Sequence, residues 1–140
     1  QSDVTRDFAS FCELAYRQGD LTHGVEELPG MVRASWVPPE FGRIVRLGRH
    51  KRVSAVWTAQ RMSEVSRAVT GATDWFVLYA QTEPRDLEEL ENRCGRAIAD
   101  RVAKFALHDS IVYDVISREV RSEADLLESL RGVGAIGETK

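Results

Sequence analysis

Two adjacent acids, Glu26 and Glu27, lie near the end of a stretch, residues 21–28, that we predict as a short β-strand. Paired carboxylates at a strand end can hold a Mg²⁺-bound water and can polarise a second water for attack on a phosphate. The simpler interpretation is two solvated acids at a strand exit. The residue types alone favour that interpretation, so the pair needs support from other parts of the chain.

A polar tetrapeptide, Thr58-Ala59-Gln60-Arg61, stands at the end of a second predicted strand, residues 53–60. A glutamine at the end of a buried strand can direct its amide at a phosphate or at an attacking water, as in the GTPases. Alternatively, Gln60 only caps the strand edge and Arg61 contacts solvent.

A third cluster, Gly48-Arg49-His50, stands between a predicted helix and the second strand. Because the planar fork of a guanidinium suits phosphate oxygens, Arg49 can reach a γ-phosphate across a subunit interface. An arginine near a helix C-terminus is also favoured there by the helix dipole, and this alternative needs no ligand. His50 alone is typical of a loop histidine.

Helical and strand-like periodicities alternate along the chain and place these clusters. Pro84 predicts the start of a long helix that extends to Phe105, Ser63 predicts a cap for a short helix with Val65 and Val69, and Ser122 with Asp125 predicts a capping box. The predicted helices cover 3–18 and 40–47 besides these, and the predicted strands cover 21–28, 53–60, 75–80 and 111–115. We therefore predict an α/β fold with a mostly parallel sheet flanked by helices, whose ligands bind at the carboxyl ends of the strands.

The composition is that of one globular domain: 140 residues, 43% hydrophobic and 29% charged. No apolar run approaches the ~18–20 residues of a membrane span, and the first residues lack the character of a signal peptide. Cys12 and Cys94 lie in helical patterns, and we interpret both as reduced core thiols of a cytoplasmic protein. The three histidines are too scattered to predict a metal site.

Basic side chains concentrate between Arg43 and Arg67, whereas acids prevail from Glu83 onward. This basic segment indicates either a surface that faces phosphates or a solvated helix face with loop arginines.

Taken in order, the clusters and elements resemble the HerA/FtsK superfamily of P-loop motor ATPases, including phage-encoded assembly ATPases akin to zonula occludens toxin-like proteins. The resemblance covers roughly residues 3–116, with Glu26-Glu27 as a Walker B-like pair. The resemblance also rests on the following segments, in chain order: Gly48-Arg49-His50, the strand ending in Thr58-Ala59-Gln60-Arg61, the segment 61–67, the strand 75–80, Asp86-Leu87, the helix with Gly95, and the strand 111–115.

This resemblance implies ATP and Mg²⁺ as ligands. Glu26 would be the acid on the Mg²⁺ side, Glu27 the general base and Gln60 the γ-phosphate sensor. Thr58 and Arg61 would contact the nucleotide, and Arg49 would act in trans within a homo-oligomeric ring. Residues 1–116 would form a partial RecA-like core, the second half of a motor domain for DNA translocation or phage assembly, and residues 117–140 a C-terminal helix and tail.

The P-loop of that family has no counterpart in this sequence. The string Gly132 to Gly137 mimics a glycine-rich phosphate motif, but Glu138 stands where a P-loop has lysine and would repel phosphate. Without a backbone cradle and a lysine, tight nucleotide binding has no physical basis. We therefore expect the chain to be inactive alone and to need an N-terminal P-loop half or a partner subunit.

Two alternatives remain open at this stage. The chain can be a non-catalytic module, derived from a P-loop ATPase, that binds nucleic acid or protein through its basic segment. It can also be a fragment whose unpaired sheet edge pairs with a second copy.

Overall fold

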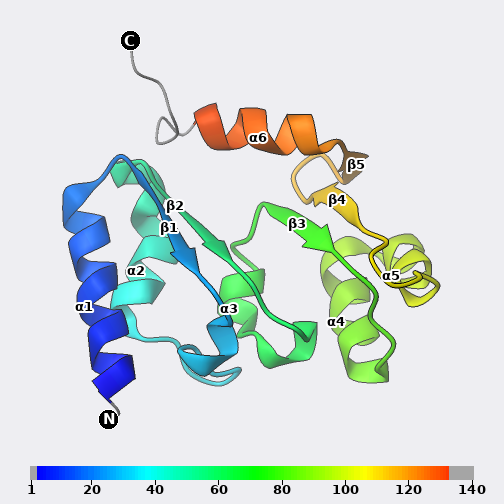
Figure 1. Cartoon of the computed structure of the whole chain (residues 1–140), viewed down its shortest axis with the longest axis horizontal. Coiled ribbons are helices and arrows are strands. Elements are labelled where there is room, and N and C mark those ends of the chain that lie inside the picture. Colours follow the sequence, from blue (N-terminus) through cyan, green and yellow to red (C-terminus); the bar gives the residue numbers. More distant parts are fainter. Residues whose placement is uncertain (1–2, 133–140) are drawn as a thin grey trace. The chain divides into compact units, whose positions relative to one another are not determined.

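The computed structural model describes residues 3–132 and divides the chain into two compact units. The first unit contains residues 3–60, 64–72 and 127–132, and the second contains residues 61–63 and 73–126. Figure 1 shows the elements in order along the chain. Most of the glycine-rich string at the C-terminus lies outside the described residues.

The first unit is built on two longer helices, α1 and α2, and two strands, with shorter helical segments between them. Its elements are α1 (Asp3–Gln18), β1 (Leu21–Val25), the 3-10 helix η1 (Leu28–Gly30), α2 (Pro39–Leu47), the 3-10 helix η2 (Gly48–Lys51), β2 (Val53–Trp57) and α3 (Arg67–Thr70). The helical periodicity of residues 3–18 and 40–47 is thus confirmed. The core gathers apolar side chains from all the longer elements, with Leu28, Val32 and Phe41 fully buried.

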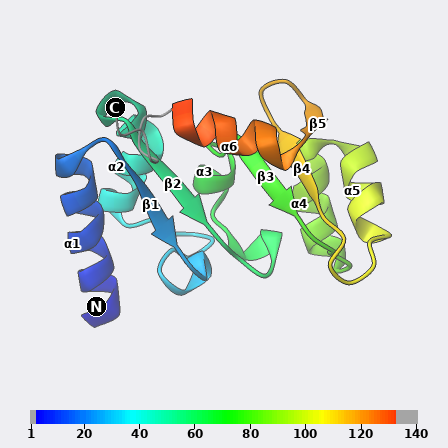
Figure 2. The same ribbon diagram turned by 45° about the horizontal axis from the view of Figure 1, so that its top comes forward.

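Strands β1 and β2 pair in parallel, with Leu21 opposite Val53 and Val25 opposite Trp57. Figures 1 and 2 show the two strands side by side in both views, with their arrowheads at the same end. Both strands end earlier than the predicted bounds 21–28 and 53–60, because the chain turns at Glu27 into η1 and leaves the ladder after Trp57. The pairing of parallel strands by way of an intervening helix is the expected βαβ arrangement.

The second unit contains a three-stranded sheet and two helices. Its elements are β3 (Trp75–Leu78), α4 (Pro84–Cys94), α5 (Arg96–Ala103), β4 (Ile111–Asp114) and β5 (Glu119–Arg121). The 3-10 helix η3 (Met62–Glu64) and the helix α6 (Glu123–Gly132) each cross the boundary between the two units. The Ser122–Asp125 capping box of α6 is confirmed by two reciprocal backbone-to-side-chain hydrogen bonds of 3.1 Å.

The α/β class is confirmed, but the expectation of a mostly parallel sheet is not met in the described residues. Strand β4 pairs antiparallel with β3 on one side and with β5 on the other. β4 and β5 are joined by a four-residue turn, which only an antiparallel pair can use. Between β3 and β4 the chain forms two packed helices, α4 and α5.

A glycine explains why the long helix predicted from residue 84 to residue 105 is two helices. Gly95 has a φ of 91° and ends α4, and α5 begins at the next residue. The apolar spacing continues across this break because both helices pack one face inward, so periodicity could not reveal it. The start at Pro84 is confirmed.

The short helix after β2 is capped by Ser66, and the prediction of a cap at Ser63 was wrong. The Ser66 side chain accepts a hydrogen bond from the backbone N–H of Ala68 at 3.2 Å, and α3 begins at Arg67. Ser63 instead lies within η3. Both serines precede apolar residues, so the local sequence offers two equivalent start signals.

Both cysteines are buried free thiols, as predicted. Burial raises the pKa of Cys12 to about 12 and that of Cys94 to about 11, so both stay protonated near neutral pH. Within residues 3–132, no helix is both long and apolar enough to cross a bilayer.

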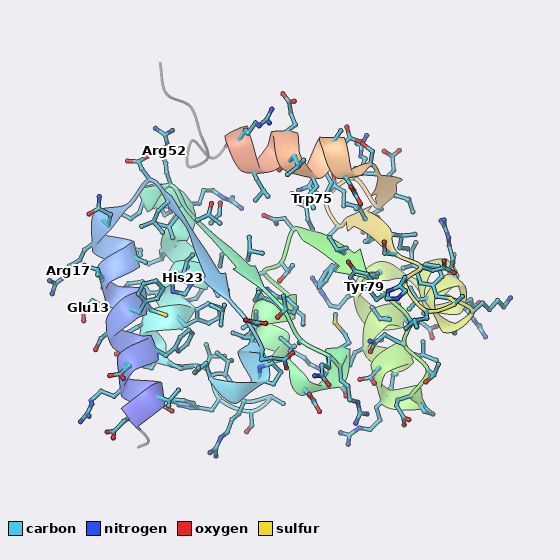
Figure 3. The ribbon with its side chains drawn as sticks, in the orientation of Figure 1. Glu13, Arg17, His23, Arg52, Trp75 and Tyr79 are labelled. Carbon is cyan, nitrogen blue, oxygen red and sulfur yellow. The ribbon has the colours of Figure 1, made fainter. Side chains whose placement is uncertain are left out.

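A histidine lies at the centre of the first unit. His23 of β1 is 1% exposed, and its ring contacts those of Phe8, Phe11 and Phe41 at centroid distances between 4.9 and 6.2 Å. Its Nε2 lies 3.6 Å from Cys12 Sγ, and its Nδ1 has no hydrogen-bond partner within the described chain. Figure 3 shows the His23 side chain directed into the unit. Burial lowers the pKa of His23, so the ring is held neutral.

Acid should therefore destabilise the protein through His23. The unfolded chain binds a proton at about pH 6.5 whereas the folded chain resists it, so stability is complete above that pH and is lost as the pH falls. We expect the melting temperature to fall between about pH 7 and pH 5, and His23→Phe to remove most of this dependence. His50→Gln serves as the control, because His50 is exposed. An unchanged pH dependence in His23→Phe would exclude His23 as the cause.

Gly48 directly follows the last residue of α2, and a close backbone approach requires a glycine there. Its φ of −55° continues the helical turn into η2, and a Cβ added there would lie 2.7 Å from the carbonyl oxygen of Val53. Gly42 in the same helix has only Val37 Cγ1 near its Cβ position, at 3.8 Å.

These two glycines should respond to alanine in opposite directions. Gly48→Ala forces η2 away from β2 and should lower the free energy of unfolding by about 1–3 kcal/mol. Gly42→Ala should raise it by about 0.5–1 kcal/mol, because alanine favours a helix without steric cost. Urea denaturation of the two variants measures both changes. Equal effects of the two substitutions would show that the Val53 carbonyl does not restrict position 48.

Candidate functional site

The carboxyl ends of β1 and β2 meet because the two strands are parallel. Beyond the ladder, the pairing continues through three bonds made by Thr58. Its N–H donates to the Val25 carbonyl at 3.0 Å, its carbonyl accepts from the N–H of Leu28 at 2.8 Å, and its Oγ1 accepts from the N–H of Glu27 at 3.0 Å. We call Glu26 and Glu27 the acid pair. Its backbone is therefore held by Thr58, which directly follows β2.

Glu27 has a left-handed backbone, with φ 53° and ψ 58°, and directly precedes η1. This conformation costs a glutamate on the order of 1 kcal/mol, and it persists only where the surroundings impose it. Here the Thr58 bonds hold Glu27 from one side and the fully buried Leu28 anchors the chain on the other. With this backbone conformation the chain turns immediately after β1, and Glu26 and Glu27 lie at the carboxyl end of that strand.

The carboxylates of Glu26 and Glu27 are exposed, and neither makes a hydrogen bond or ion pair within residues 3–132. Two adjacent unpaired carboxylates fit a Mg²⁺ ion, which typically takes one or two protein carboxylates and completes its shell with water and substrate phosphates. They do not fit a metal held by protein alone, because the described residues contain no group of three or more metal-binding side chains.

Gln60 lies two residues beyond Thr58, exposed at the same end of the strand pair. Glu26, Glu27, Thr58 and Gln60 thus belong to one unit and follow the carboxyl ends of paired strands. Such a set can bind a hydrated cation and direct an amide at a phosphate or a water.

Arg61 belongs to the second unit and has a structural partner there. Its Nε donates to Oδ2 of Asp86 at 3.0 Å, and Oδ1 of the same carboxylate accepts the Ser63 N–H at 2.9 Å. Asp86 is 2% exposed. Burial raises its pKa, but the hydrogen bonds from Ser63 and Arg61 outweigh burial and hold the pKa of Asp86 below its ordinary value. Contact of Arg61 with phosphate remains a prediction.

Asp86 is a residue whose partners sequence reasoning missed. It stands at the third position of α4, where acids are common because the helix dipole favours them, so its type gave no reason to look further. Its bonds to the 61–63 segment span more than twenty positions, and no local pattern encodes that contact. Asp86 therefore connects the segment 61–63, which follows β2, to the start of α4.

Arg49 lies at the opposite end of the strand pair. It belongs to η2, directly before β2, whereas Glu27 and Thr58 follow β1 and β2. The five residues of β2 alone span about 16 Å, which exceeds the reach of an arginine side chain. Arg49 therefore does not join the acid pair of its own chain.

Comparison with solved structures reveals a close similarity of fold. The genome packaging NTPase B204 of Sulfolobus turreted icosahedral virus 2, in complex with ATP-gammaS, superposes with a TM-score of 0.74 at 17% identity, over 86% of this chain and 60% of that one. Its complex with AMP gives 0.73 at 17%, over 86% and 61%. B204 of Sulfolobus turreted icosahedral virus, described as a DNA-packaging ATPase, gives 0.71 at 18%, over 86% and 60%.

The chain shares the fold of a viral packaging NTPase. It spans about 60% of the length of these NTPase chains. No protein-family model matches the sequence, and no curated protein sequence matches it. The likeness therefore concerns fold, and the roles of individual residues must be argued from the geometry of this chain.

Thr58 provides a direct test of how the acid pair is held. Thr58→Val keeps the shape of the side chain but removes the acceptor for the Glu27 N–H, so that amide should exchange with solvent several-fold faster. We expect a loss of about 0.5–1.5 kcal/mol in the free energy of unfolding.

Thr22→Val on β1 is the matched control. The buried Oγ1 of Thr22 has no hydrogen-bond partner in the described part of the chain, so its removal should be neutral or stabilising. Hydrogen exchange followed by NMR measures both variants. An unchanged Glu27 exchange rate in Thr58→Val would mean that Thr58 does not hold the acid pair.

Proposed function

We propose that this chain is the second half of an ATP-hydrolysing motor domain of the HerA/FtsK type. The observation that carries the proposal is the acid pair Glu26-Glu27, held by Thr58 at the carboxyl ends of two parallel strands. Support comes from the shared fold with an NTPase that has been solved with ATP-gammaS. The motor would move DNA or serve phage assembly, in the cytoplasm.

We call the carboxyl ends of β1 and β2, with Glu26, Glu27 and Gln60, the acid end. Each of these three residues has a separate role in this proposal. Glu26 would hold Mg²⁺ through water, and the ion would neutralise charge on the phosphates. Glu27 would accept the proton of the attacking water, and Gln60 would orient that water or sense the γ-phosphate. Exposure of both carboxylates supports these roles, because an acid already paired with a protein cation could not serve a ligand.

A cradle for the nucleotide phosphates must come from another segment. Phosphate binding requires several backbone N–H groups and a cation directed at one point, and the described acid end supplies carboxylates instead. The packaging NTPase chains are longer than the part that this chain matches, which supports a missing portion. We propose an N-terminal P-loop half, or a partner subunit, as its source.

Arg49 would act on a neighbouring subunit. Because it lies at the amino end of β2, it cannot complete the site of its own chain, whereas a homo-oligomeric ring can bring it to the acid end of the next copy. An arginine supplied in trans stabilises charge on the transferred phosphoryl group.

Weak but localised nucleotide binding is the expected behaviour of the chain alone. In NMR titrations with Mg²⁺ and a non-hydrolysable ATP analogue, amide shifts should move at residues 26–28 and 58–60, with an apparent Kd near the millimolar range, about −4 kcal/mol. EDTA should reverse the shifts and Glu27→Gln should alter them. Glu13→Gln is the control, since Glu13 is occupied by an ion pair with Arg17 on α1.

Two results would contradict the proposal. Shifts confined to other residues would place any nucleotide site elsewhere, and absence of shifts from folded protein at millimolar analogue would favour a non-catalytic module. Tight binding seen by calorimetry would instead mean that these residues, alone or as an oligomer, already supply a phosphate cradle.

A further inference from the structure

A cysteine and a histidine meet in the core of the first unit and take no part in the proposed ATPase site. Cys12 of α1 and His23 of β1 are 0% and 1% exposed, and Cys12 Sγ lies 3.6 Å from His23 Nε2. Because they come from different elements, no local spacing of metal ligands in the sequence indicates that they meet. We call these two residues the Cys–His pair.

Only a weak hydrogen bond joins the two side chains. Burial raises the pKa of Cys12 to about 12 and lowers the pKa of His23, so near neutral pH a neutral thiol lies beside a neutral imidazole. A thiol is a weak donor and a weak acceptor, and the second ring nitrogen of His23, Nδ1, has no hydrogen-bond partner within residues 3–132. A sulfur and a nitrogen that suit a soft metal ion therefore face each other.

The number of ligands restricts which ions this pair can hold. Zn²⁺ takes four ligands, and residues 3–132 contain no group of three or more side chains that could hold a metal ion. Soft monovalent ions with a filled d shell, such as Cu(I) and Ag(I), are satisfied by two ligands in a line. Metal bonds of roughly 2 Å to sulfur and to nitrogen together span about 4 Å, so the 3.6 Å between Sγ and Nε2 needs to widen only slightly.

The apolar surroundings of the pair also favour a monovalent ion. One positive charge on the ion cancels the charge of the Cys12 thiolate, and the imidazole of His23 adds none. A divalent ion would leave a net charge among the rings of Phe8, Phe11 and Phe41, which is costly in an apolar core. Glu40 of α2 acts on Cys12 through its charge, and the same negative charge attracts a cation.

We propose that the Cys–His pair binds one soft monovalent metal ion of the Cu(I) class between Cys12 Sγ and His23 Nε2. The ion displaces the thiol proton, which passes to solvent, and forms one bond to sulfur and one to nitrogen without a change in oxidation state. The bound ion replaces the weak hydrogen bond and joins α1 to β1. Phe11 is 54% exposed and its ring lies 4.9 Å from that of His23, so rotation of Phe11 opens a path from solvent.

This inference does not rest on the ATPase proposal, because neither residue of the pair belongs to the acid end. Either ligand can fail to bind without affecting the other.

Titration of the reduced, full-length chain with Cu(I) under anaerobic conditions tests the proposal, and Ag(I) serves as a probe that undergoes no redox reaction. We expect one ion per chain, release of one proton, and a melting temperature raised by roughly 5 °C or more at saturation, since the ion binds the folded chain more tightly. In NMR spectra the Nε2 signal of His23 should move, whereas the ring signals of His50 and His108 should not. Zn²⁺ should produce none of these changes.

Cys12→Ala and His23→Phe should each weaken Ag(I) binding at least about tenfold, because each removes one of two ligands. Cys94→Ala is the matched control: Cys94 is also a buried free thiol, but it makes no hydrogen bond with a histidine in the described part of the chain. This control should bind within about twofold of the unchanged protein.

Three results would each overturn the proposal: no uptake of either ion by the unchanged protein, equal weakening by Cys94→Ala, or undiminished binding by His23→Phe. If a variant at the pair does not fold, the ring-nitrogen signals of the unchanged protein decide, and an unmoved Nε2 signal of His23 at saturation excludes the site.

Discussion

The parallel pairing of β1 with β2 is the constraint on which the first unit depends. Because the strands run in the same direction, their carboxyl ends lie side by side. The residues after each strand are therefore close in space although they are far apart in the sequence. The pairing continues past the ladder through Thr58, which bonds to Val25, Glu27 and Leu28. Those bonds impose the left-handed backbone of Glu27 and turn the chain into η1. A shift in register would separate Thr58 from the acid pair.

The same pairing separates charge. The turns from α1 into β1 and from η2 into β2 lie together at one end, where Arg49 and Arg52 stand, whereas Glu26 and Glu27 occupy the other end. Between them, His23 is held neutral among Phe8, Phe11 and Phe41.

The second unit is organised by a different type of contact. Buried Asp86 accepts bonds from Arg61 and Ser63 and so fixes the segment 61–63 to the start of α4. This arrangement changes the interpretation of Arg61, because an arginine already bonded to a buried carboxylate serves the structure whether or not it also meets a ligand. The antiparallel sheet β3-β4-β5 shows that an alternation of helices and strands does not by itself determine strand direction.

The sequence by itself determined the elements whose periodicity is long or whose ends carry strong signals: α1, α2, β1, β2, the start of α4 at Pro84 and the Ser122–Asp125 cap of α6. It also identified Glu26, Glu27, Thr58 and Gln60 as polar residues at the ends of predicted strands, because residue type and position along a strand are local properties. Only the tertiary structure decided that Thr58 holds Glu27, that Arg49 lies at the opposite end, that Arg61 bonds to Asp86, and that Gly95 divides a helix. These facts depend on strand direction and on contacts between distant residues. Periodicity specifies which face of an element is buried, whereas the partner that buries it is chosen by the packing of the whole unit.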